Sequence, residues 1–250
     1  MAKSIAVAGK GGTGKSTIAA LLVEGLKGRG KGPVLAVDAD ADSSLGMLLG
    51  VPPEQTIGDL REEVRREMIN LPPGMTKAAY VEAGLHELIQ EEKGFDLISM
   101  GRGEGSGCYC YLNSLIKKFS DDLAPSYPWM VIDNEAGLEH ISRRTSVDID
   151  AMLIIVTDNP LSLGSATRIK ELTDGLEDRV KSRYLITNMV SEDRLPFIQE
   201  RLSELGIEQL CHIPRDPRLD DLIFRGESVG ALTDSPILPC IETILKRIGG

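Results

Sequence analysis

Long apolar runs and an excess of basic side chains are both missing from this 250-residue sequence. No run approaches the roughly 20 residues that a membrane-spanning helix needs, so we expect no membrane partner. The chain has 28 lysines and arginines against 38 aspartates and glutamates, which gives a formal net charge of −10. Because non-specific nucleic-acid binding relies on basic side chains that neutralise phosphates, this balance argues against a nucleic-acid partner.

The sequence also has no Ser/Pro-rich linker, no block of like charges and no internal repeat. Its length suits one domain with a sizeable core, and we predict a single domain over residues 1–250. The first apolar strand begins at Ser4, which leaves no room for a signal peptide, so we expect a cytoplasmic protein. Four cysteines in a reducing compartment are not a disulfide framework, and a close pair among them indicates metal or redox chemistry.

Apolar runs typical of buried parallel strands alternate with helical patterns along the chain. The runs lie at residues 4–8, 34–37, 95–100, 129–133, 152–157, 184–188 and 211–216. Between the second and third runs, residues 57–68 and 76–92 have the pattern of charge-laced amphipathic helices. The alternation predicts an α/β fold, with a mostly parallel, doubly wound sheet and helices on both faces.

A glycine-rich loop follows the first strand and leads into an apolar helix. It reads Gly9-Lys10-Gly11-Gly12-Thr13-Gly14-Lys15-Ser16-Thr17. This is the pattern G-x-x-x-x-G-K-[ST] in the strand-to-helix context that supports it. The glycines let backbone N–H groups surround phosphate oxygens at the helix N-terminus, where the macrodipole favours negative charge. Lys15 would reach the β- and γ-phosphates and Ser16 would ligate Mg²⁺, so the loop predicts a nucleotide phosphate site.

Lys10, directly after the first glycine, is not required by a phosphate loop. The sequence GKGGTGKST resembles the deviant phosphate loop of the P-loop NTPase family that includes the nitrogenase iron protein, the Min and Par partition ATPases and the arsenite-pump ATPase. The resemblance implies an ATPase in which Lys10 crosses a dimer interface to the nucleotide of the partner subunit. The alternative is a solvated loop lysine.

Three alternating aspartates, Asp38, Asp40 and Asp42, follow the second apolar run, at the sheet edge where open α/β folds bind ligands. Coulomb repulsion would raise the pKa of at least one of them unless Mg²⁺ or the loop lysine neutralises them. The family resemblance implies that Asp38 or Asp40 orients the attacking water. Asp42 is then expected to sense the γ-phosphate or to make a cap with Ser43. The alternative is a solvated acidic turn in which Asp42 or Ser43 caps a helix at Leu45.

Cys108 and Cys110 form a C-x-C pair after the glycine-rich stretch 101–107. In an extended chain both thiols lie on one face and can bind one metal ion, and soft thiolates suit Ni²⁺ or Zn²⁺. Two thiolates leave the coordination shell incomplete, whereas a two-fold dimer supplies four. We therefore predict a nickel or zinc site shared by two protomers, with simple core packing or a redox pair as alternatives. Cys211 and Cys240, in apolar settings, are expected to be buried thiols.

Further nucleotide contacts are expected at the ends of later strands. Asp133 ends the run 129–133 and is the Walker-B-type aspartate that would hold Mg²⁺. The family resemblance implies that Gly137 binds the γ-phosphate and that Asn188 recognises the adenine. It also suggests that Pro214 and Arg215 line the pocket for the base.

Taken in order, the segments GKGGTGKST, VDADADSS, GSGCYCY, IDNEAGLEHISRRT and the ITN strand resemble the nickel-insertion ATPases that mature carbon monoxide dehydrogenase and acetyl-CoA synthase. The resemblance covers nearly the whole chain, and the C-x-C pair together with DNEAG narrows it to this branch. It implies ATP and Mg²⁺ as cofactors, Ni²⁺ (or Zn²⁺ at the same site), a homodimer, and apo carbon monoxide dehydrogenase or acetyl-CoA synthase as the client.

Other branches of the family fit less well. No cysteine lies between Cys110 and Cys211, which leaves a bridging iron–sulfur cluster without its second ligand. The amphipathic segment 237–250 carries only Lys246 and Arg247 as basic residues, so core packing is expected there rather than the membrane contact of Min proteins. The alternative function is a Min- or Par-type ATP-driven positioning switch without metal.

Overall fold

The computed structural model describes residues 2–67, 76–102, 122–134, 148–175 and 179–249. Within these residues the strands form one eight-stranded sheet with the order β3-β4-β2-β5-β1-β6-β7-β8. Neighbouring strands are parallel throughout, except that β3 is antiparallel to β4. The strands are β1 (Lys3–Gly9), β2 (Val34–Asp38), β3 (Gln90–Glu92), β4 (Phe95–Ser99), β5 (Trp129–Asp133), β6 (Ala151–Val156), β7 (Arg183–Asn188) and β8 (Glu208–Ile213).

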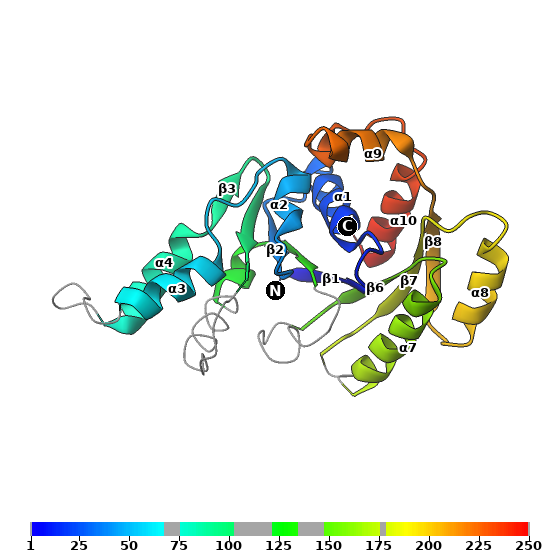
Figure 1. Cartoon of the computed structure of the whole chain (residues 1–250), viewed down its shortest axis with the longest axis horizontal. Helices are drawn as coiled ribbons and strands as arrows, with labels where there is room; N and C mark the ends of the chain where they lie inside the picture. Colours follow the sequence, from blue (N-terminus) through cyan, green and yellow to red (C-terminus); the bar gives the residue numbers. More distant parts are fainter. Residues whose placement is uncertain (1, 68–75, 103–121, 135–147, 176–178, 250) are drawn as a thin grey trace.

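Helices cover both faces of this sheet (Figure 1). One face carries α1 (Lys15–Gly28), α2 (Ser44–Leu49), α9 (Pro217–Phe224) and α10 (Leu238–Ile248). The other face carries α3 (Ile57–Glu67), α4 (Lys77–Glu87), α7 (Pro160–Asp174) and α8 (Leu195–Ser203). Two short 3₁₀ turns, η1 and η2, lie at Ala124–Ser126 and Val229–Ala231. The predicted α/β fold with a mostly parallel sheet is confirmed.

The central strands carry unbroken apolar runs because they supply two cores at once, although β1 begins with Lys3 and Ser4 and both β2 and β5 end in an aspartate. In β1, Ile5 and Val7 belong to the core under α1, whereas Ala6 and Ala8 belong to the core under α7 and α8. Successive strand residues point to opposite faces, so a strand covered by helices on both sides needs an unbroken apolar run. The polar residues therefore collect where the strands end.

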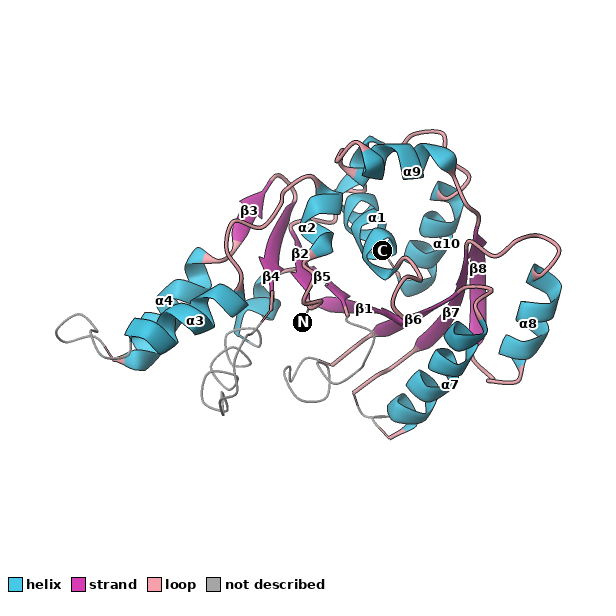
Figure 2. Cartoon of the chain, viewed as in Figure 1, coloured by secondary structure: helices cyan, strands magenta, loops and turns pink. Residues whose placement is uncertain are grey.

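The edge strand β3 departs from the sequence prediction of one helix over residues 76–92. Helix α4 ends at Glu87, and residues 90–92 turn back along β4 as a short antiparallel strand (Figure 2). The two-residue turn Lys93-Gly94 makes this reversal possible, since Gly94 has a φ of +94° that other residues adopt only at a cost. The charge pattern of residues 90–92 suits a helix surface and an exposed edge strand equally well.

Cys211 and Cys240 were expected to be separate buried thiols, and that expectation was wrong. They form a disulfide that joins β8 to the first turn of α10, with the two Cα atoms 5.9 Å apart. The residues are separated by 29 positions in the sequence. Only the packing of α10 onto the sheet brings them together.

The C-terminal helix α10 packs in the core, as the sequence predicts. Ile241, Ile244 and Leu245 are buried, and Gly25 of α1 allows close approach, because a Cβ there would lie 2.8 Å from Leu245 Cδ1. The ammonium of Lys3 donates to the carbonyl of Gly249 at 3.1 Å. Helix α1, which follows the phosphate loop, thus packs directly against the C-terminal helix α10.

Candidate functional site

The phosphate loop has the backbone shape that its glycines predict. Gly12 and Gly14 have φ values of +81° and +86°, and Gly14 is the N-cap residue of α1. Within the loop, the Thr13 hydroxyl and amide both donate to the carbonyl of Lys10, at 2.8 and 3.2 Å. A Cβ at Gly11 or Gly12 would meet nothing within 4 Å. The loop therefore faces open space at the start of a helix, which is the geometry of an anion site.

Asn188, at the end of β7, holds this loop from the side. Its side-chain Nδ2 donates to the carbonyl of Thr13 at 2.8 Å, and the residue is buried. A Cβ at Gly14 would lie 2.5 Å from that Nδ2. Glycine at position 14 is thus required both by its φ and by the approach of Asn188.

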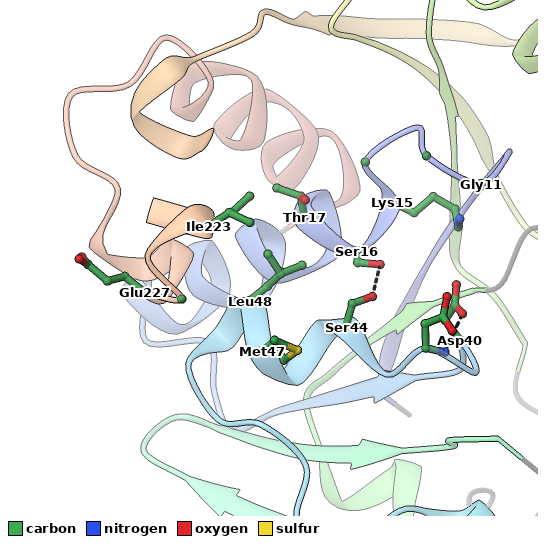
Figure 3. Close-up of a pocket in the computed structure, with 14 residues that line it drawn as sticks. Gly11, Lys15, Ser16, Thr17, Asp40, Ser44, Met47, Leu48, Ile223 and Glu227 are labelled. Atoms are coloured by element: carbon green, nitrogen blue, oxygen red, sulfur yellow. Dashed lines mark hydrogen bonds between the residues drawn. The ribbon is translucent and has the colours of Figure 1, made fainter. Parts of the chain in front are cut away.

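A cavity of about 470 Å³ opens beside the phosphate loop. Lys15 points into it on the side of Asp40, and Thr17 lies toward Ile223 (Figure 3). The lining residues come from the phosphate loop and the start of α1, the segment after β2, α2, the end of α9 and the turn after α9: Gly11, Gly12, Gly14, Lys15, Ser16, Thr17, Asp40, Asp42, Ser44, Met47, Leu48, Ile223, Gly226 and Glu227.

The three alternating aspartates have different roles in the structure. Asp38 is buried, and its two carboxylate oxygens accept hydrogen bonds from the amides of Asp40 (3.2 Å) and Leu45 (2.8 Å). Burial, with a smaller contribution from the charge of Asp40, raises its pKa to about 6 against the opposing effect of these two backbone bonds. The alternative cap by Asp42 or Ser43 was therefore wrong: Asp38 makes the bond at Leu45, and Ser43 makes no side-chain cap bond.

Asp40 and Asp42 both line the cavity, Asp40 partly buried and Asp42 exposed. Asp40 Oδ1 accepts the amide of Asp42 at 3.1 Å. Ser44, at the start of α2, donates to the hydroxyl of Ser16 at 3.4 Å (Figure 3). The segment between β2 and α2 that carries Asp40 and Asp42, called the acidic loop below, thus meets the phosphate loop at the two serines.

Asp133 lies directly beside Asp38, because β5 and β2 pair with these two residues in register. It is fully buried, and neither of its carboxylate oxygens has a hydrogen-bond partner among the described residues. Burial, with a smaller contribution from the charge of Asp38, raises its pKa to about 7 against the opposing effects of the nearby Ser16 hydroxyl and the Lys15 ammonium.

These residues fit Mg²⁺. Two orphaned, buried carboxylate oxygens on Asp133 are costly unless a cation or a proton satisfies them, and hard oxygen ligands are those that Mg²⁺ prefers. With a nucleotide present, Ser16 and Asp133 would hold the ion between them and the phosphates. The ion would supply charge neutralisation at the phosphates.

The residues predicted to contact the base do not line the cavity. Asn188 contacts the phosphate loop, Pro214 is half-buried, and Arg215 is exposed and pairs with Asp220 at 2.9 Å. None of Asn188, Pro214 and Arg215 is among the described residues that line the cavity. Their contact with a base stays a prediction.

The remaining predicted site residues are the two cysteines of the C-x-C pair, Gly137 and Lys10. Cys108, Cys110 and Gly137 lie outside the described residues. Lys10 is half-exposed, and no ion pair involves it within the described part of the chain. Its role across a dimer interface stays a prediction.

Sequence reasoning missed the wall of the cavity opposite the phosphate loop. Met47 and Leu48 of α2, Ile223 of α9 and Glu227, which follows α9, form this wall. Met47 and Ile223 are 61% and 39% exposed. In sequence, they read as parts of short amphipathic helices, and no local signal marks them as neighbours of a nucleotide.

Comparison with known proteins identifies the family. A model of the CobQ/CobB/MinD/ParA nucleotide binding domain matches residues 4–229. The chain therefore belongs to this family of nucleotide-binding domains. The phosphate loop, the acidic loop and Asp133 all fall within the matched residues.

Individual relatives span nearly the whole chain. An uncharacterized ATP-binding protein of Methanocaldococcus jannaschii is 39% identical over 247 residues, covering 98% of this chain and 97% of that protein. The carbon monoxide dehydrogenase accessory protein CooC of Rhodospirillum rubrum is 32% identical over 264 residues, covering 98% and 97%. Among solved structures, the MinD cell division protein of Aquifex aeolicus aligns with a TM-score of 0.72 at 22% identity, covering 99% and 96%. The last likeness shows the fold alone.

No helix in the described ranges is long and apolar enough to span a membrane. No group of three or more histidine, cysteine, aspartate or glutamate side chains that could hold a metal ion occurs in the same ranges.

Proposed function

We propose that this protein is an ATP-hydrolysing, homodimeric maturation factor that delivers nickel to apo carbon monoxide dehydrogenase or acetyl-CoA synthase. The observation that carries the proposal is the 32% identity to a carbon monoxide dehydrogenase accessory protein over 98% of this chain. The sequence adds Cys108 and Cys110 as soft ligands that suit nickel. In this function the nickel ion is the cargo, and ATP with Mg²⁺ drives its transfer.

The site supports ATP hydrolysis with divided roles. Lys15 and the loop amides would bind the phosphates, and Ser16 with Asp133 would hold Mg²⁺. Between the two candidates for orienting the attacking water, the geometry favours Asp40. Both oxygens of Asp38 already accept backbone amides, whereas the Asp40 carboxylate lines the cavity.

The position of β4 in the sheet supports a link between nucleotide and metal. Strand β4 pairs with β2, so that Ser99 lies opposite Asp38, and the chain that leaves β4 continues to Cys108 and Cys110. The C-x-C pair thus follows, by about ten residues, the strand beside the acidic loop. We expect Cys108 and Cys110 of two protomers to share one ion.

The test is metal content and oligomeric mass, measured together by anaerobic size-exclusion chromatography with metal analysis. Apo, ADP-bound and ATP-bound protein are loaded with NiCl₂ and compared with the Cys108→Ser and Cys110→Ser variants. The expected result is one nickel per dimer, lost in both variants while ATP hydrolysis stays measurable. Cys240→Ser is the matched control and should keep the nickel, since Cys240 belongs to the disulfide.

A nucleotide-dependent dimer that holds no thiol-bound nickel would contradict the proposal. It would favour the Min- or Par-type positioning switch, for which a MinD relative of Helicobacter pylori at 26% identity over 97% of this chain is a precedent. Equal loss of nickel binding and ATP hydrolysis in the cysteine variants would also count against metal delivery as a separate step.

A further inference from the structure

The cavity beside the phosphate loop changes in chemical character from one end to the other. Lys15 and Asp40 lie at one end, and Glu227 lies at the opposite end (Figure 3). Between these ends, two helices present aliphatic side chains to the cavity, Met47 from α2 and Ile223 from α9. A ligand that fills this space therefore meets a cation at the loop and an apolar surface beyond it.

The charges indicate which part of a nucleotide lies at each end. Lys15 is the one basic side chain among the described residues that line the cavity, and it stands in the first turn of α1. Its ammonium and the helix N-terminus both favour phosphates there. At the opposite end, the Glu227 carboxylate lies 3.9 Å from the guanidinium of Arg225, so that end offers no excess positive charge to a phosphate. The sugar and base of a bound nucleotide would thus extend past Thr17 toward Ile223.

The aliphatic side chains on this path are accessible, unlike their neighbours on the same helices. Met47 is 61% exposed and Ile223 is 39% exposed, whereas Leu45 of α2 and Leu219 of α9 are buried in the core. The cavity volume of about 470 Å³ is typical of small-molecule sites, which are lined mainly by apolar side chains. A flat, uncharged base that covers Met47 and Ile223 would remove their apolar surface from water, which favours binding.

The residues that the family resemblance assigns to the base are engaged elsewhere. The Asn188 side-chain amide donates to the carbonyl of Thr13, and Arg215 pairs with Asp220. Neither Asn188 nor Arg215 is among the described residues that line the cavity. The apolar wall is therefore the better candidate surface for the base.

We propose that the sugar and base of ATP lie between α2 and α9, with Met47 and Ile223 in contact with the base. These two side chains then contribute to the affinity for the nucleoside part of ATP and leave the binding of the phosphates to the loop. The proposal rests on the ATP part of the function proposed above and does not involve nickel.

The experiment measures, by calorimetry with Mg²⁺, the Kd of a non-hydrolysable ATP analogue and the Kd of inorganic tripolyphosphate, which has the phosphates without sugar and base. Ile223→Ala and Met47→Ala should each weaken the ATP analogue about threefold to tenfold, because each buried methylene group contributes a factor of about four. Both variants should change the affinity for tripolyphosphate less than twofold. Ile223→Leu should keep most of the affinity for the ATP analogue.

Phe224→Ala is the matched control. Phe224 follows Ile223 on α9, is 92% exposed, and is not among the described residues that line the cavity. Its truncation removes a larger apolar side chain from the same helix and should leave both Kd values unchanged.

Unchanged affinity for the ATP analogue in both Ile223→Ala and Met47→Ala would overturn the proposal, and a loss in Arg215→Ala instead would support the base contact implied by the family resemblance. Equal weakening of the ATP analogue and of tripolyphosphate would also overturn it, because the wall would then act through the phosphate loop. Wild-type protein that binds neither compound would refute the ATP part of the proposed function, and this proposal with it.

Discussion

Asp38 and Asp133 lie in register at the carboxyl ends of the neighbouring parallel strands β2 and β5, and both are fully buried. Their environments differ: the oxygens of Asp38 accept two backbone amides, whereas those of Asp133 have no partner among the described residues. Two carboxylates held side by side cannot both ionise without cost. Without a metal ion, the pair therefore retains a proton to a higher pH than an ordinary aspartate does.

This pair predicts that the apo protein loses stability as the pH rises. Burial raises the pKa of Asp133 to about 7 and that of Asp38 to about 6, from an ordinary value of 3.8. Between about pH 4 and 7 the folded state therefore binds more protons than the unfolded state, and its free energy of unfolding falls with rising pH. Urea unfolding in EDTA, at steps from pH 5 to pH 8, should show the decline.

Asp133→Asn should flatten that pH dependence and stabilise the apo protein at pH 8 by about 1–3 kcal/mol, because it removes an unpaired buried charge. Asp174→Asn, at an exposed carboxylate whose pKa is lowered by its hydrogen bonds to Lys170 and Arg183, is the control and should leave the slope between pH 5 and 8 unchanged. Wild-type stability that rises with pH over this range would show that the pair is ionised without a metal. Mg²⁺-ATP binding should strengthen over the same range, since the ion competes with protons.

Asn188 is predicted to act on the phosphate loop as well as on any base. Asn188→Ala removes the 2.8 Å bond to the Thr13 carbonyl and should lower the free energy of unfolding by about 1 kcal/mol. The misplaced loop should then bind ATP and GTP more weakly by the same factor. Titration with fluorescent ATP and GTP analogues checks this. A loss confined to ATP would instead support the adenine contact predicted from the sequence.

Most of the fold was predictable because its signals are local. The apolar runs of β1, β2 and β5 are long and bounded by turn residues, and a strand covered on both faces must be apolar throughout. The reversal at Gly94 could not be predicted, because residues 90–92 carry the same charges in a helix or on an edge strand. The disulfide between Cys211 and Cys240 depends on how α10 packs, which no local pattern encodes.

The parts of the candidate site that have local sequence signals were predictable, and the parts that depend on packing were not. The phosphate loop and Asp133 stand at strand ends, where topology alone brings ligand-binding residues together. The wall formed by Met47 and Ile223 comes from two helices that are far apart in sequence and adjacent only in the folded chain. The choice between Asp38 and Asp40 likewise depended on hydrogen bonds that form after folding.

Alanine variants of Lys10 and Lys15 should have different defects, the first in dimerisation and the second in nucleotide binding. The side chain of Lys10 is half-exposed, while its carbonyl makes the two bonds to Thr13 that shape the loop, so Lys10→Ala keeps the backbone intact. We expect ATP binding within about twofold of wild type, no ATP-dependent dimer, and a loss of hydrolysis of about 100-fold or more, as for a cation that acts in trans.

Lys15→Ala should instead abolish ATP binding, because Lys15 is buried and points into the cavity (Figure 3). Light scattering after size exclusion, with a coupled phosphate assay, distinguishes the two variants. Lys31→Ala, at an exposed loop lysine, is the control. An ATP-dependent dimer that survives in Lys10→Ala would leave Lys10 as a solvated loop residue.

The disulfide between Cys211 and Cys240 predicts that the stability of the fold depends on redox conditions. It closes a loop across 29 positions, and a crosslink of that size stabilises a fold by about 2–4 kcal/mol, chiefly by restricting the unfolded chain. Oxidised wild-type protein should therefore unfold at higher urea than Cys240→Ser, and dithiothreitol should remove the difference. Because Ile241 and Leu245 pack α10 against Gly25 of α1, ATP affinity at low urea should stay equal in the two proteins, with α10 held by its apolar contacts. Free-thiol counts that stay the same after air oxidation would show that the two sulfurs do not pair in solution, and the stability difference should then vanish with them.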